Sequence, residues 1–365
     1  MKLALVHEHL AQDGGAEKVL QAFQELYPDA PTYTLVHNHD RANPSFLHKD
    51  IRTSFIQKMP YGVKKYQWYL PLMPLAVERF DLMDYDVVLS SASAFAKGVI
   101  TRPDAVHICY CHSPTRYLWS DTHQYIDALP YNRMIKRAIL MLFPYLRQWD
   151  RLAADRVDHF IANSKTVQNR IRKYYHRDST IIYPPVDVDA FSVSDDVEKY
   201  FLTGGRLVAY KRYDLTIQAF NRLGLPLLVF GAGPEEKRLR AMAKNTITFL
   251  GRVDDRRLRR LMSRAMAFIH PQEEDFGITP VESMAAGRPV IAYGKGGALE
   301  TVRPGVTGVF FEEQSWEALA DAVLRFRHAD FNPVVIQARA AEFGRPQFAA
   351  RIRHFLARQT NRQVP

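Results

Sequence analysis

Cysteine and long apolar runs are both scarce in this sequence. Only Cys109 and Cys111 occur among 365 residues; they are too few to build a zinc site alone, and they suggest a reducing compartment. They alternate on an expected strand and so point to the same face, which disfavours a mutual disulfide. No stretch approaches the roughly 18 to 20 apolar residues of a membrane-spanning helix, and charge returns too soon after Met1 for a signal peptide. We therefore expect a soluble or peripheral protein.

Negative charge is also in short supply. The chain has 39 acidic and 49 basic residues, a formal net charge of +10 and a pI near 9.5. This balance fits an anionic ligand, an anionic membrane surface or nucleic acid, and it does not choose among them. With 47% apolar and 24% charged residues the chain has a globular composition rather than a disordered one. Its length exceeds the usual single domain, so we expect two domains.

Short apolar runs that alternate with helical patterns indicate an α/β protein. In the first half we expect strands at residues 3–6, 86–90, 105–109 and 159–162 and a helix at residues 16–26. The second half is more regular, with strands expected at residues 200–203, 227–230, 247–250, 267–270 and 290–292, and with helices beginning near Tyr213, Pro234, Asp254, Thr279 and Leu299. This spacing predicts parallel sheets with crossover helices.

The domain boundary is expected at the proline-containing connector that runs from Tyr183 to Asp187. Residues 1–185 then form an N-terminal domain and residues 186–345 a C-terminal domain. Residues 346–365 follow a break at Gly344-Arg345-Pro346 and contain a last helix, roughly residues 347–359, which could return to the N-terminal domain. The expected fold is two doubly wound, Rossmann-like domains, whose ligands bind outside the carboxyl ends of the strands.

The strongest chemical signal is the stretch from Glu274 to Glu282, which follows an expected strand and opens a helix. The backbone N–H groups of Phe276, Gly277 and Ile278 would lie at the N-terminus of that helix, where they suit hydroxyls or phosphate oxygens. Two carboxylates at opposite ends of the junction could each hold a different part of one polyol. The alternative is an acidic loop followed by a surface glutamate.

Three further motifs stand at expected strand ends. Arg206 and Lys211 flank a tight segment where two cations can converge on one diphosphate, although loop cations are commonly only solvated. Gly14-Gly15 would let the backbone approach phosphate before a helix, or form a plain turn. His112 follows the strand that holds the two cysteines; Arg116, beyond it, would touch acceptor phosphate or form a surface salt bridge.

These motifs resemble those of the retaining glycosyltransferases of family 4, over nearly the whole chain and most closely in its C-terminal half. The usual Glu-Gly-Phe-Gly is here Glu-Asp-Phe-Gly, a change at a variable position. The resemblance implies the GT-B architecture of two facing Rossmann-like domains and a nucleotide-sugar donor. It also implies roles for single residues. Glu274 would bind hydroxyls of the donor sugar and Glu282 the ribose, while the backbone of Phe276, Gly277 and Ile278 would hold the sugar and the backbone of Val253 the base. His112 would lie beside the reacting sugar, and the diphosphate would be bound by Arg206, Lys211, Gly14 and Gly15. Asn163-Ser164-Lys165 matches a further family segment.

The segments around Gly14-Gly15 and from Tyr293 to Glu300 look like a bacterial mannosyltransferase subgroup that uses GDP-mannose in O-antigen or exopolysaccharide assembly. UDP-glucose or another UDP-hexose is the alternative donor. The resemblance implies retention of configuration and no cofactor beyond the donor. We also expect no metal, because no Asp-x-Asp motif stands at a strand end and Arg206 with Lys211 could take over its charge role.

Two segments mix bases with aromatic or apolar residues, residues 61–73 and 134–145. They suit the inner face of an anionic cytoplasmic membrane, where a polyprenyl-diphosphate-linked saccharide acceptor would lie. Burial in the N-terminal core is the alternative, and no motif for nucleic acid accompanies them. We thus expect a cytoplasmic, peripheral enzyme. A sugar-nucleotide epimerase and a non-catalytic sugar-nucleotide sensor remain rival functions.

Overall fold

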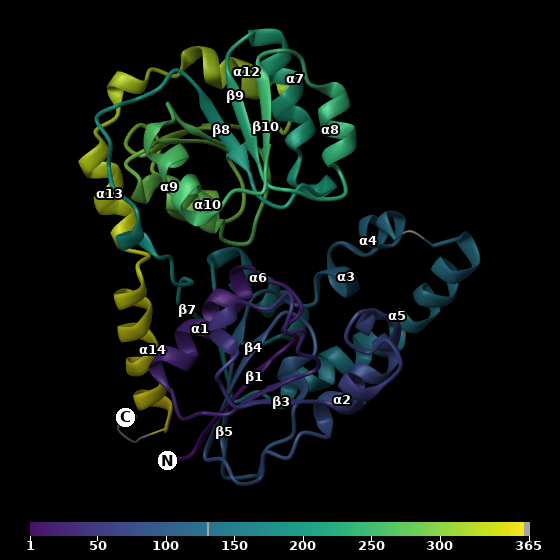
Figure 1. Cartoon of the computed structure of the whole chain (residues 1–365). Coiled ribbons are helices and arrows are strands. Elements are labelled where there is room, and N and C mark those ends of the chain that lie inside the picture. The colour runs from purple at the N-terminus through teal and green to yellow at the C-terminus, as the bar shows by residue number, and fades with distance from the viewer. Residues whose placement is uncertain (130, 361–365) are drawn as a thin grey trace. The chain divides into compact units, whose positions relative to one another are not determined.

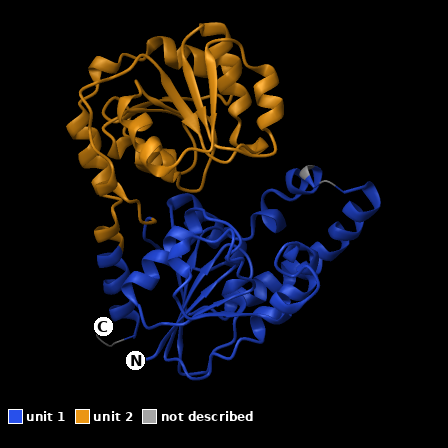
Figure 2. Ribbon diagram, in the orientation of Figure 1, with its two compact units in different colours: residues 1–183, 349–365 blue, residues 184–348 orange. Residues whose placement is uncertain are grey.

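The computed structural model describes residues 1–129 and 131–360 (Figure 1). The chain divides into two compact units (Figure 2): unit 1 holds residues 1–183 and the chain from Ala349 onward, and unit 2 holds residues 184–348. Each unit contains one parallel sheet with helices packed on it. The predicted α/β fold of two doubly wound, Rossmann-like domains is therefore confirmed.

The sheet of unit 1 has seven parallel strands in the order β3-β2-β1-β4-β5-β6-β7. Its strands are β1 (Leu3–His7), β2 (Thr32–Thr34), β3 (Ile51–Thr53), β4 (Val87–Ala92), β5 (Val106–Cys111), β6 (His159–Ala162) and β7 (Ser179–Ile181). Its helices are α1 (Gly15–Leu26), α2 (Met73–Glu78), α3 (Arg116–Trp119), α4 (Thr122–Ala128), α5 (Arg133–Asp155), α6 (Lys165–Tyr175) and most of α14 (Arg345–Thr360).

Both faces of this sheet are covered, which explains why its central strands are mostly apolar. One face packs against α2, α5 and α6 in a single hydrophobic cluster. Cys109 and Cys111 point to that face, and both are buried free thiols. The prediction that they do not pair with each other is confirmed. On the other face Tyr110 packs edge-on against Phe23 of α1, with ring centroids 5.8 Å apart.

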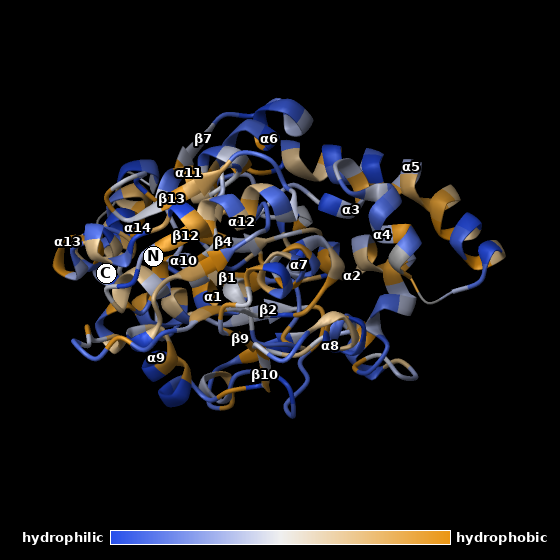
Figure 3. Cartoon of the chain, turned by 90° about the horizontal axis from the view of Figure 1, so that it is seen from above, coloured by the Kyte–Doolittle hydropathy of each residue, from blue (hydrophilic) through white to orange (hydrophobic). Residues whose placement is uncertain are grey.

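A buried carboxylate ties α5 to this cluster. Asp150 is 1% exposed and accepts hydrogen bonds from the Lys97 ammonium, the Thr115 hydroxyl, the Trp119 indole and the Tyr175 hydroxyl. Because a buried carboxylate is stable only when its oxygens are bonded, these donors fix the C-terminal half of α5 against α3, α6 and the 3₁₀ turn (Ala96–Gly98) that follows β4. The N-terminal half of α5 projects away from the sheet (Figure 1) and carries apolar and polar residues interleaved (Figure 3).

The sheet of unit 2 has six parallel strands in the order β10-β9-β8-β11-β12-β13. They are β8 (Phe201–Gly204), β9 (Leu227–Phe230), β10 (Ile247–Gly251), β11 (Phe268–His270), β12 (Val290–Tyr293) and β13 (Gly308–Phe311). Its helices are α7 (Tyr213–Leu223), α8 (Glu236–Met242), α9 (Asp255–Arg264), α10 (Ile278–Ala285), α11 (Ala298–Thr301), α12 (Trp316–Arg325) and α13 (Pro333–Ala341). Helices α7, α8 and α12 cover one face, with α9, α10 and α13 on the other (Figure 1).

Each sheet reverses its strand order at one point, between β1 and β4 in unit 1 and between β8 and β11 in unit 2. In open parallel sheets this reversal separates the loops beyond the carboxyl ends of the two strands and leaves room there for a ligand. A binding site is therefore expected at the residues that end these four strands.

Several predicted elements begin one or two residues from their expected starts, and four strands were not predicted. The last helix, α14, begins at Arg345 rather than after a break that includes Pro346. Proline fits the first turn of a helix, where its missing N–H would have no partner. The unpredicted strands are β2, β3, β7 and β13, of which the first three have only three residues each.

Candidate functional site

Two of the sequence motifs of unit 2 meet at its strand-order reversal. Lys211 ends a short 3₁₀ turn (Ala209–Lys211) that follows β8, and Glu274 lies in the loop after β11. The Lys211 Nζ atom is 2.7 Å from the Glu274 Oε1 atom, and the two side chains are 14% and 18% exposed. This ion pair places one cation and one carboxylate, both with limited access to water, beyond the carboxyl ends of β8 and β11.

The loop after Glu274 ends at an uncapped helix N-terminus. Gly277 is the N-cap residue of α10, and no side chain caps its first turn. Its φ of +85° lies in the left-handed region, which favours glycine. The N-terminal N–H groups of α10 therefore remain available to a polyol or an anion, with the positive end of the helix dipole behind them.

A second turn, which contains Gly297, contacts this loop. Gly297 donates its N–H to the Glu274 carbonyl at 2.8 Å, and a Cβ on Gly297 would come within 2.3 Å of the Phe276 backbone. Any larger residue at position 297 would therefore push the loop away. The Lys295-Gly-Gly sequence fixes the backbone of the 274–278 loop, while Phe276 itself is buried against Phe343 with ring centroids 5.5 Å apart.

The electrostatics of the pair favour a charged Glu274. Burial raises the pKa of a carboxyl, but the electrostatic interactions with Lys211 and His270 and the hydrogen bonds from Lys211 and Gln272 outweigh it. The pKa of Glu274 is therefore lower than usual, and the carboxylate is ionised at neutral pH. An ionised carboxylate can only accept hydrogen bonds, which suits sugar hydroxyls.

Sequence reasoning missed two residues of this group. His270 ends β11 and is 1% exposed, and neither ring nitrogen has a hydrogen-bond partner among the described residues. Burial, reinforced by Lys211 against the opposing charge of Glu274, lowers the pKa of His270 to about 4. Gln272 is buried as well, and its Oε1 has no partner among the described residues. Polar atoms left this way inside a protein are costly, and their position at a strand end was the available signal.

Three further predicted residues of unit 2 lie on other segments. The Arg206 side chain is exposed, in the segment between β8 and the 3₁₀ turn. Glu282 is half-buried within α10, and Val253 is half-buried after β10. The structure brings Lys211 and Glu274 into contact, and Arg206, Glu282 and Val253 lie on separate segments of the same unit.

In unit 1 the glycine loop and His112 are linked through residues for which the sequence predicted no role. Gly14 is the N-cap of α1, without a side-chain cap, and Gly15 is the first helical residue. His112 follows β5 and donates its backbone N–H to Ala92 at 2.8 Å. Between these two segments lie the buried side chains of Glu17, His7 and Ser91.

These side chains form a chain of contacts across the strand-order reversal. His7 and Ser91 are register partners on β1 and β4. Ser91 Oγ is 3.1 Å from His7 Nδ1 and 2.8 Å from His112 Nε2, and Glu17 Oε1 is 3.8 Å from His7 Nε2. Burial, together with His7 and against the charge of Glu17, lowers the pKa of His112 to about 3. His112 is therefore neutral throughout the physiological range.

Arg116 and the segment Asn163–Lys165, which the sequence singled out, bond to other residues of the protein. Arg116 pairs with Asp121, with Nη2 to Oδ2 at 2.6 Å, so the salt-bridge alternative is realised. Asn163 donates to the His112 carbonyl at 3.0 Å, and Ser164 caps α6 by accepting from Val167. Lys165 bonds Gln168 on the same helix. These residues hold the ends of β5 and β6 together and so support the position of His112.

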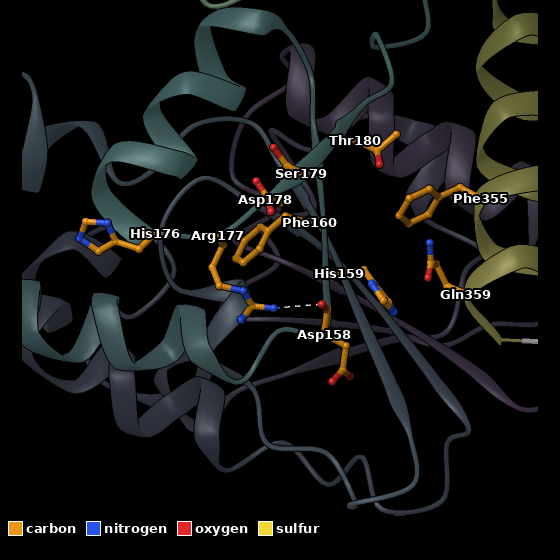
Figure 4. Close-up of a pocket in the computed structure, with 10 residues that line it drawn as sticks. All are labelled: Asp158, His159, Phe160, His176, Arg177, Asp178, Ser179, Thr180, Phe355 and Gln359. Carbon is orange, nitrogen blue, oxygen red and sulfur yellow. Dashed lines mark hydrogen bonds between the residues drawn. The ribbon is translucent and has the colours of Figure 1, made fainter.

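A hollow of about 390 Å³ lies at the other edge of the unit 1 sheet (Figure 4). It is lined by residues at the starts of β6 and β7 and by Phe355 and Gln359 of α14. Its Arg177 guanidinium donates to the carbonyls of Ala154, Val157 and Asp158, where α5 ends. Since ligands of such sheets bind at the carboxyl ends of strands, we assign this arginine to helix capping and not to a site.

Two properties concern metals and membranes. Within residues 1–129 and 131–360, no group of three or more histidine, cysteine or acidic residues could hold a metal ion. Over the same residues, no helix has both the length and the apolar character needed to cross a membrane.

Comparison with known proteins agrees with this architecture. The family described as "Glycosyltransferase Family 4" matches residues 13–190, and "Glycosyl transferases group 1" matches residues 187–341. The two matches overlap at residues 187–190 and together run without a gap from the glycine loop to α13.

Among curated relatives, the O-antigen chain mannosyltransferase RfbU of Salmonella typhimurium is 30% identical over 208 residues, covering 50% of this chain and 58% of the relative. The GDP-mannose-dependent alpha-(1-6)-phosphatidylinositol monomannoside mannosyltransferase of Mycobacterium tuberculosis is 28% identical over 214 residues, covering 50% and 56%. The match thus spans less than two thirds of each of these relatives.

Among solved structures, Anabaena Alr3699/HepE in complex with UDP has a TM-score of 0.73 at 19% identity and covers 98% of this chain and 100% of its own. The same protein has also been solved with UDP-glucose, and that structure gives a TM-score of 0.72. At this identity the likeness establishes the fold alone.

Proposed function

Because this chain belongs to the glycosyltransferases of family 4 and has their GT-B fold, we propose that it transfers mannose from GDP-mannose to a lipid-linked saccharide, with retention of configuration. The observation that carries the proposal is the Lys211–Glu274 ion pair beside the uncapped N-terminus of α10. It joins a cation for a diphosphate to a carboxylate for sugar hydroxyls at the ligand-binding edge of one sheet.

The cations serve the leaving group. When the bond between the anomeric carbon and the β-phosphate oxygen breaks, negative charge grows on the nucleoside diphosphate. The Lys211 ammonium has three N–H donors and Glu274 takes one, so the others can bond phosphate oxygens. Arg206, whose side chain is exposed, adds a planar fork of donors. Stabilising charge that develops only in the transition state accelerates the chemical step.

Glu274 and the 276–278 backbone serve the sugar. The carboxylate accepts from sugar hydroxyls, and the N–H groups at the start of α10 donate to them or to phosphate. Glu282, farther along α10, is proposed to hold the ribose, and Val253 the base through its backbone. In unit 1, Gly14 and Gly15 are proposed to approach the diphosphate and His112 the reacting sugar.

The reaction balances without a further reactant. The anomeric carbon loses its phosphate oxygen and gains the acceptor oxygen, and the acceptor proton passes to the departing phosphate. If both events occur on the same face of the sugar, the anomeric configuration is retained. The proposal needs no metal and no cofactor other than the donor itself.

Mannose from GDP-mannose is favoured by two observations of relatives. The Salmonella relative is a mannosyltransferase, and the mycobacterial one is GDP-mannose-dependent. UDP-glucose is the alternative donor, because the structural neighbour HepE binds UDP and UDP-glucose. Melting temperatures of the whole chain with GDP, GDP-mannose, UDP and UDP-glucose separate the two. A ligand at 100 times its Kd stabilises by about 2.7 kcal/mol, and a larger shift with the UDP ligands would replace mannose by a UDP-hexose.

Release of free nucleoside diphosphate tests the transfer itself. A transferase releases it only when a polyprenyl-diphosphate-linked saccharide is added. An epimerase would convert the donor sugar without any acceptor, and a sensor would bind the donor without turnover. Acceptor-independent conversion, or binding with no release under any condition, would refute the proposed activity.

Peripheral attachment to an anionic membrane is the second part of the proposal. On α5, Met134, Arg137, Met141 and Tyr145 recur at helical spacing, and the three apolar side chains are 79%, 77% and 54% exposed. Trp68 is 56% exposed with the Lys65 ammonium 5.8 Å from its ring centroid. Exposed apolar side chains beside bases suit the headgroup region of anionic lipids.

Some aromatic residues of these two segments are buried, contrary to the expectation from the sequence. Phe143 is 1% exposed and belongs to the core of unit 1, so its expected place at a membrane is wrong. Tyr66 and Tyr69 pack partly against the same core. The proposed surface is therefore Trp68 with its neighbouring lysines, and the Met134–Tyr145 stripe.

Co-sedimentation with anionic and neutral vesicles tests this attachment. Each base near such a surface contributes about 1 kcal/mol, so changing Lys64, Lys65, Lys136 and Arg137 to Gln should abolish salt-sensitive binding. A matched control changes four arginines of α9 in unit 2, Arg256, Arg257, Arg259 and Arg260, to Gln. If only the control loses binding, the surface lies on unit 2; if wild type ignores anionic vesicles at low salt, there is no such surface.

A further inference from the structure

We propose that Glu17, His7 and Ser91 form a positioning relay that fixes His112 as the tautomer protonated at Nε2, so that its Nδ1 presents a lone pair to a hydroxyl of the substrate. The relay rests on the proposed function for the identity of that substrate. It goes further in one respect, because it states which kind of atom His112 recognises.

The first step concerns Ser91. Its Oγ is 3.1 Å from His7 Nδ1 and 2.8 Å from His112 Nε2. A serine hydroxyl has one proton to donate, and in the relay that we propose both imidazoles are neutral: one accepts this proton and the other donates to Oγ. Two arrangements of this kind satisfy both contacts. Either His7 carries its proton on Nε2 and His112 on Nε2, or both carry it on Nδ1.

Glu17 selects between these arrangements. Its Oε1 lies 3.8 Å from His7 Nε2, and both side chains are almost fully buried, at 2% and 1% exposed. A carboxylate at this distance favours a proton on the facing nitrogen electrostatically, although the separation exceeds a hydrogen bond. His7 then has a bare Nδ1, which accepts from Ser91, and Ser91 accepts from His112 Nε2–H. His112 is left with a bare Nδ1.

The protonation states agree with this selection. Burial raises the pKa of Glu17, but the interaction with His7, with smaller help from His9, outweighs burial and lowers that pKa. Burial, with His7 and against Glu17, makes His112 neutral. Glu8, also buried nearby, has its carboxylate occupied by the backbone N–H groups of residues 93–96.

The position of the relay points to a ligand and not only to stability. It crosses the strand-order reversal of unit 1, where such sheets bind ligands. No hydrogen bond to His112 Nδ1 occurs within residues 1–129 and 131–360, and His112 is only half-buried. Glu17 Oε2, buried without a partner among these residues, points at the glycine loop, 3.1 Å from where a Cβ of Gly14 would be.

The tautomer of His112 determines which ligand atoms it can bind. A bare Nδ1 accepts a hydrogen bond from a hydroxyl, whereas a phosphate oxygen offers no proton and is repelled. The structure thus assigns His112 to a hydroxyl of the donor sugar or of the acceptor, and leaves phosphate to other groups. If the relay were reversed, His112 would present Nδ1–H and prefer phosphate oxygens.

Nitrogen-15 NMR of the whole chain, labelled in histidine and recorded at pH 7 without substrate, reads the tautomer directly. The ring nitrogens with and without a proton differ widely in chemical shift, and His112 is assigned by the signals lost in His112→Gln. We expect a protonated Nε2 and a bare Nδ1. A bare Nε2 with a protonated Nδ1 in the wild type would overturn the relay.

Two variants test the selection. Glu17→Gln removes the charge at nearly constant volume and should move His112 toward the other tautomer or a mixture, whereas Glu25→Gln, an exposed change on the same helix, should not. Ser91→Ala cuts the relay and should also give a mixture, and it serves if Glu17→Gln does not fold. An unchanged His112 tautomer in folded Glu17→Gln refutes the role of Glu17.

Kinetics separate positioning from mere packing. Glu17→Gln should lower kcat about tenfold, which is about 1.4 kcal/mol of transition-state stabilisation, with a melting temperature close to that of Glu25→Gln. Because the NMR measurement needs no substrate, its result stands even if no transfer is found. A correct tautomer without transfer activity would therefore refute the proposed function and leave the relay intact.

Discussion

Replacing Lys211 by Met removes the charge that both halves of the unit 2 site depend on. Methionine is nearly as long as lysine and fits partly buried positions, so the change removes the ammonium with little change in packing. Glu274 then loses its 2.7 Å partner but keeps Gln272 and the remaining solvent contact, since it is 18% exposed. The expected result is a folded protein with a slow chemical step.

The size of the effect follows from the contact. A hydrogen bond to a charged group contributes about 1.5–3 kcal/mol, and about 1.4 kcal/mol is tenfold in rate. Loss of one such bond to the leaving diphosphate lowers kcat by about 10- to 150-fold. Stability changes less, by about 1 kcal/mol, because Glu274 remains solvated in part, and this lowers the melting temperature of a domain this size by about 2–4 °C.

Steady-state kinetics and thermal melting measure both quantities. Lys199→Met, which removes an exposed lysine of the same unit, controls for the loss of one positive charge. Lys211→Arg keeps the charge with a different shape and should recover part of kcat. Near-normal kcat in a folded Lys211→Met protein would refute the assignment of the diphosphate to this position.

The pH dependence of stability gives an independent check without substrate. The pKa of Glu274 is lower in the folded protein than its usual value, so its contribution to stability is present above the usual carboxyl pKa and is lost as pH falls through the folded value. The stability difference between wild type and Lys211→Met should accordingly be constant near pH 7 and shrink in acid. A difference that grows in acid would contradict the ion pair.

Three further outcomes follow from the same structure. Asp150→Asn should lower the free energy of unfolding in urea by about 3–5 kcal/mol, because it leaves the buried Lys97 ammonium unpaired. Asp155→Asn, in an exposed pair on the same helix, should lower it by at most about 1 kcal/mol. Equal losses of stability would contradict this account. His270→Phe removes two buried nitrogens without partners among the described residues, so it should keep or raise the melting temperature and lower donor affinity in calorimetry; unchanged affinity would make His270 structural. Transfer should persist in EDTA, and activity lost in EDTA but restored by magnesium would show that a metal acts at the diphosphate.

The long apolar strands were predictable because parallel strands are buried on both faces and their sequences are continuous apolar runs. Strands β6 and β9 have the predicted bounds, and the helix at Tyr213 begins as predicted. Strands β2 and β3 could not be found this way, since three residues such as Thr32–Thr34 contain too little pattern. The continuation of α5 through Pro144 was equally hidden, because an interior proline normally ends a helix.

The sequence predicted single site residues where they stand in a motif, but not the contacts between residues of different motifs. Glu274 and Lys211 are 63 residues apart, and their motifs indicated each residue separately, but the 2.7 Å contact between them depends on β8 and β11 being neighbours. The relay was not predictable at all. His7 and Ser91 come together because β1 pairs with β4 in one register, and nothing in the residues near either position specifies that register.

The two units place different chemistry at the same topological position. At the reversal of unit 1 the Ser91 hydroxyl is 2.8 Å from His112 Nε2, and the pKa of His112 of about 3 leaves it uncharged. At the reversal of unit 2 the contact is between full charges. Charges respond to ionic strength and neutral hydrogen bonds respond little, so the two sets can be told apart in one experiment. Rates limited by Lys211 should fall as salt rises, whereas the ratio of wild-type to Ser91→Ala rates should stay constant with salt. We propose this division of roles, in which unit 2 neutralises the diphosphate and unit 1 recognises a hydroxyl.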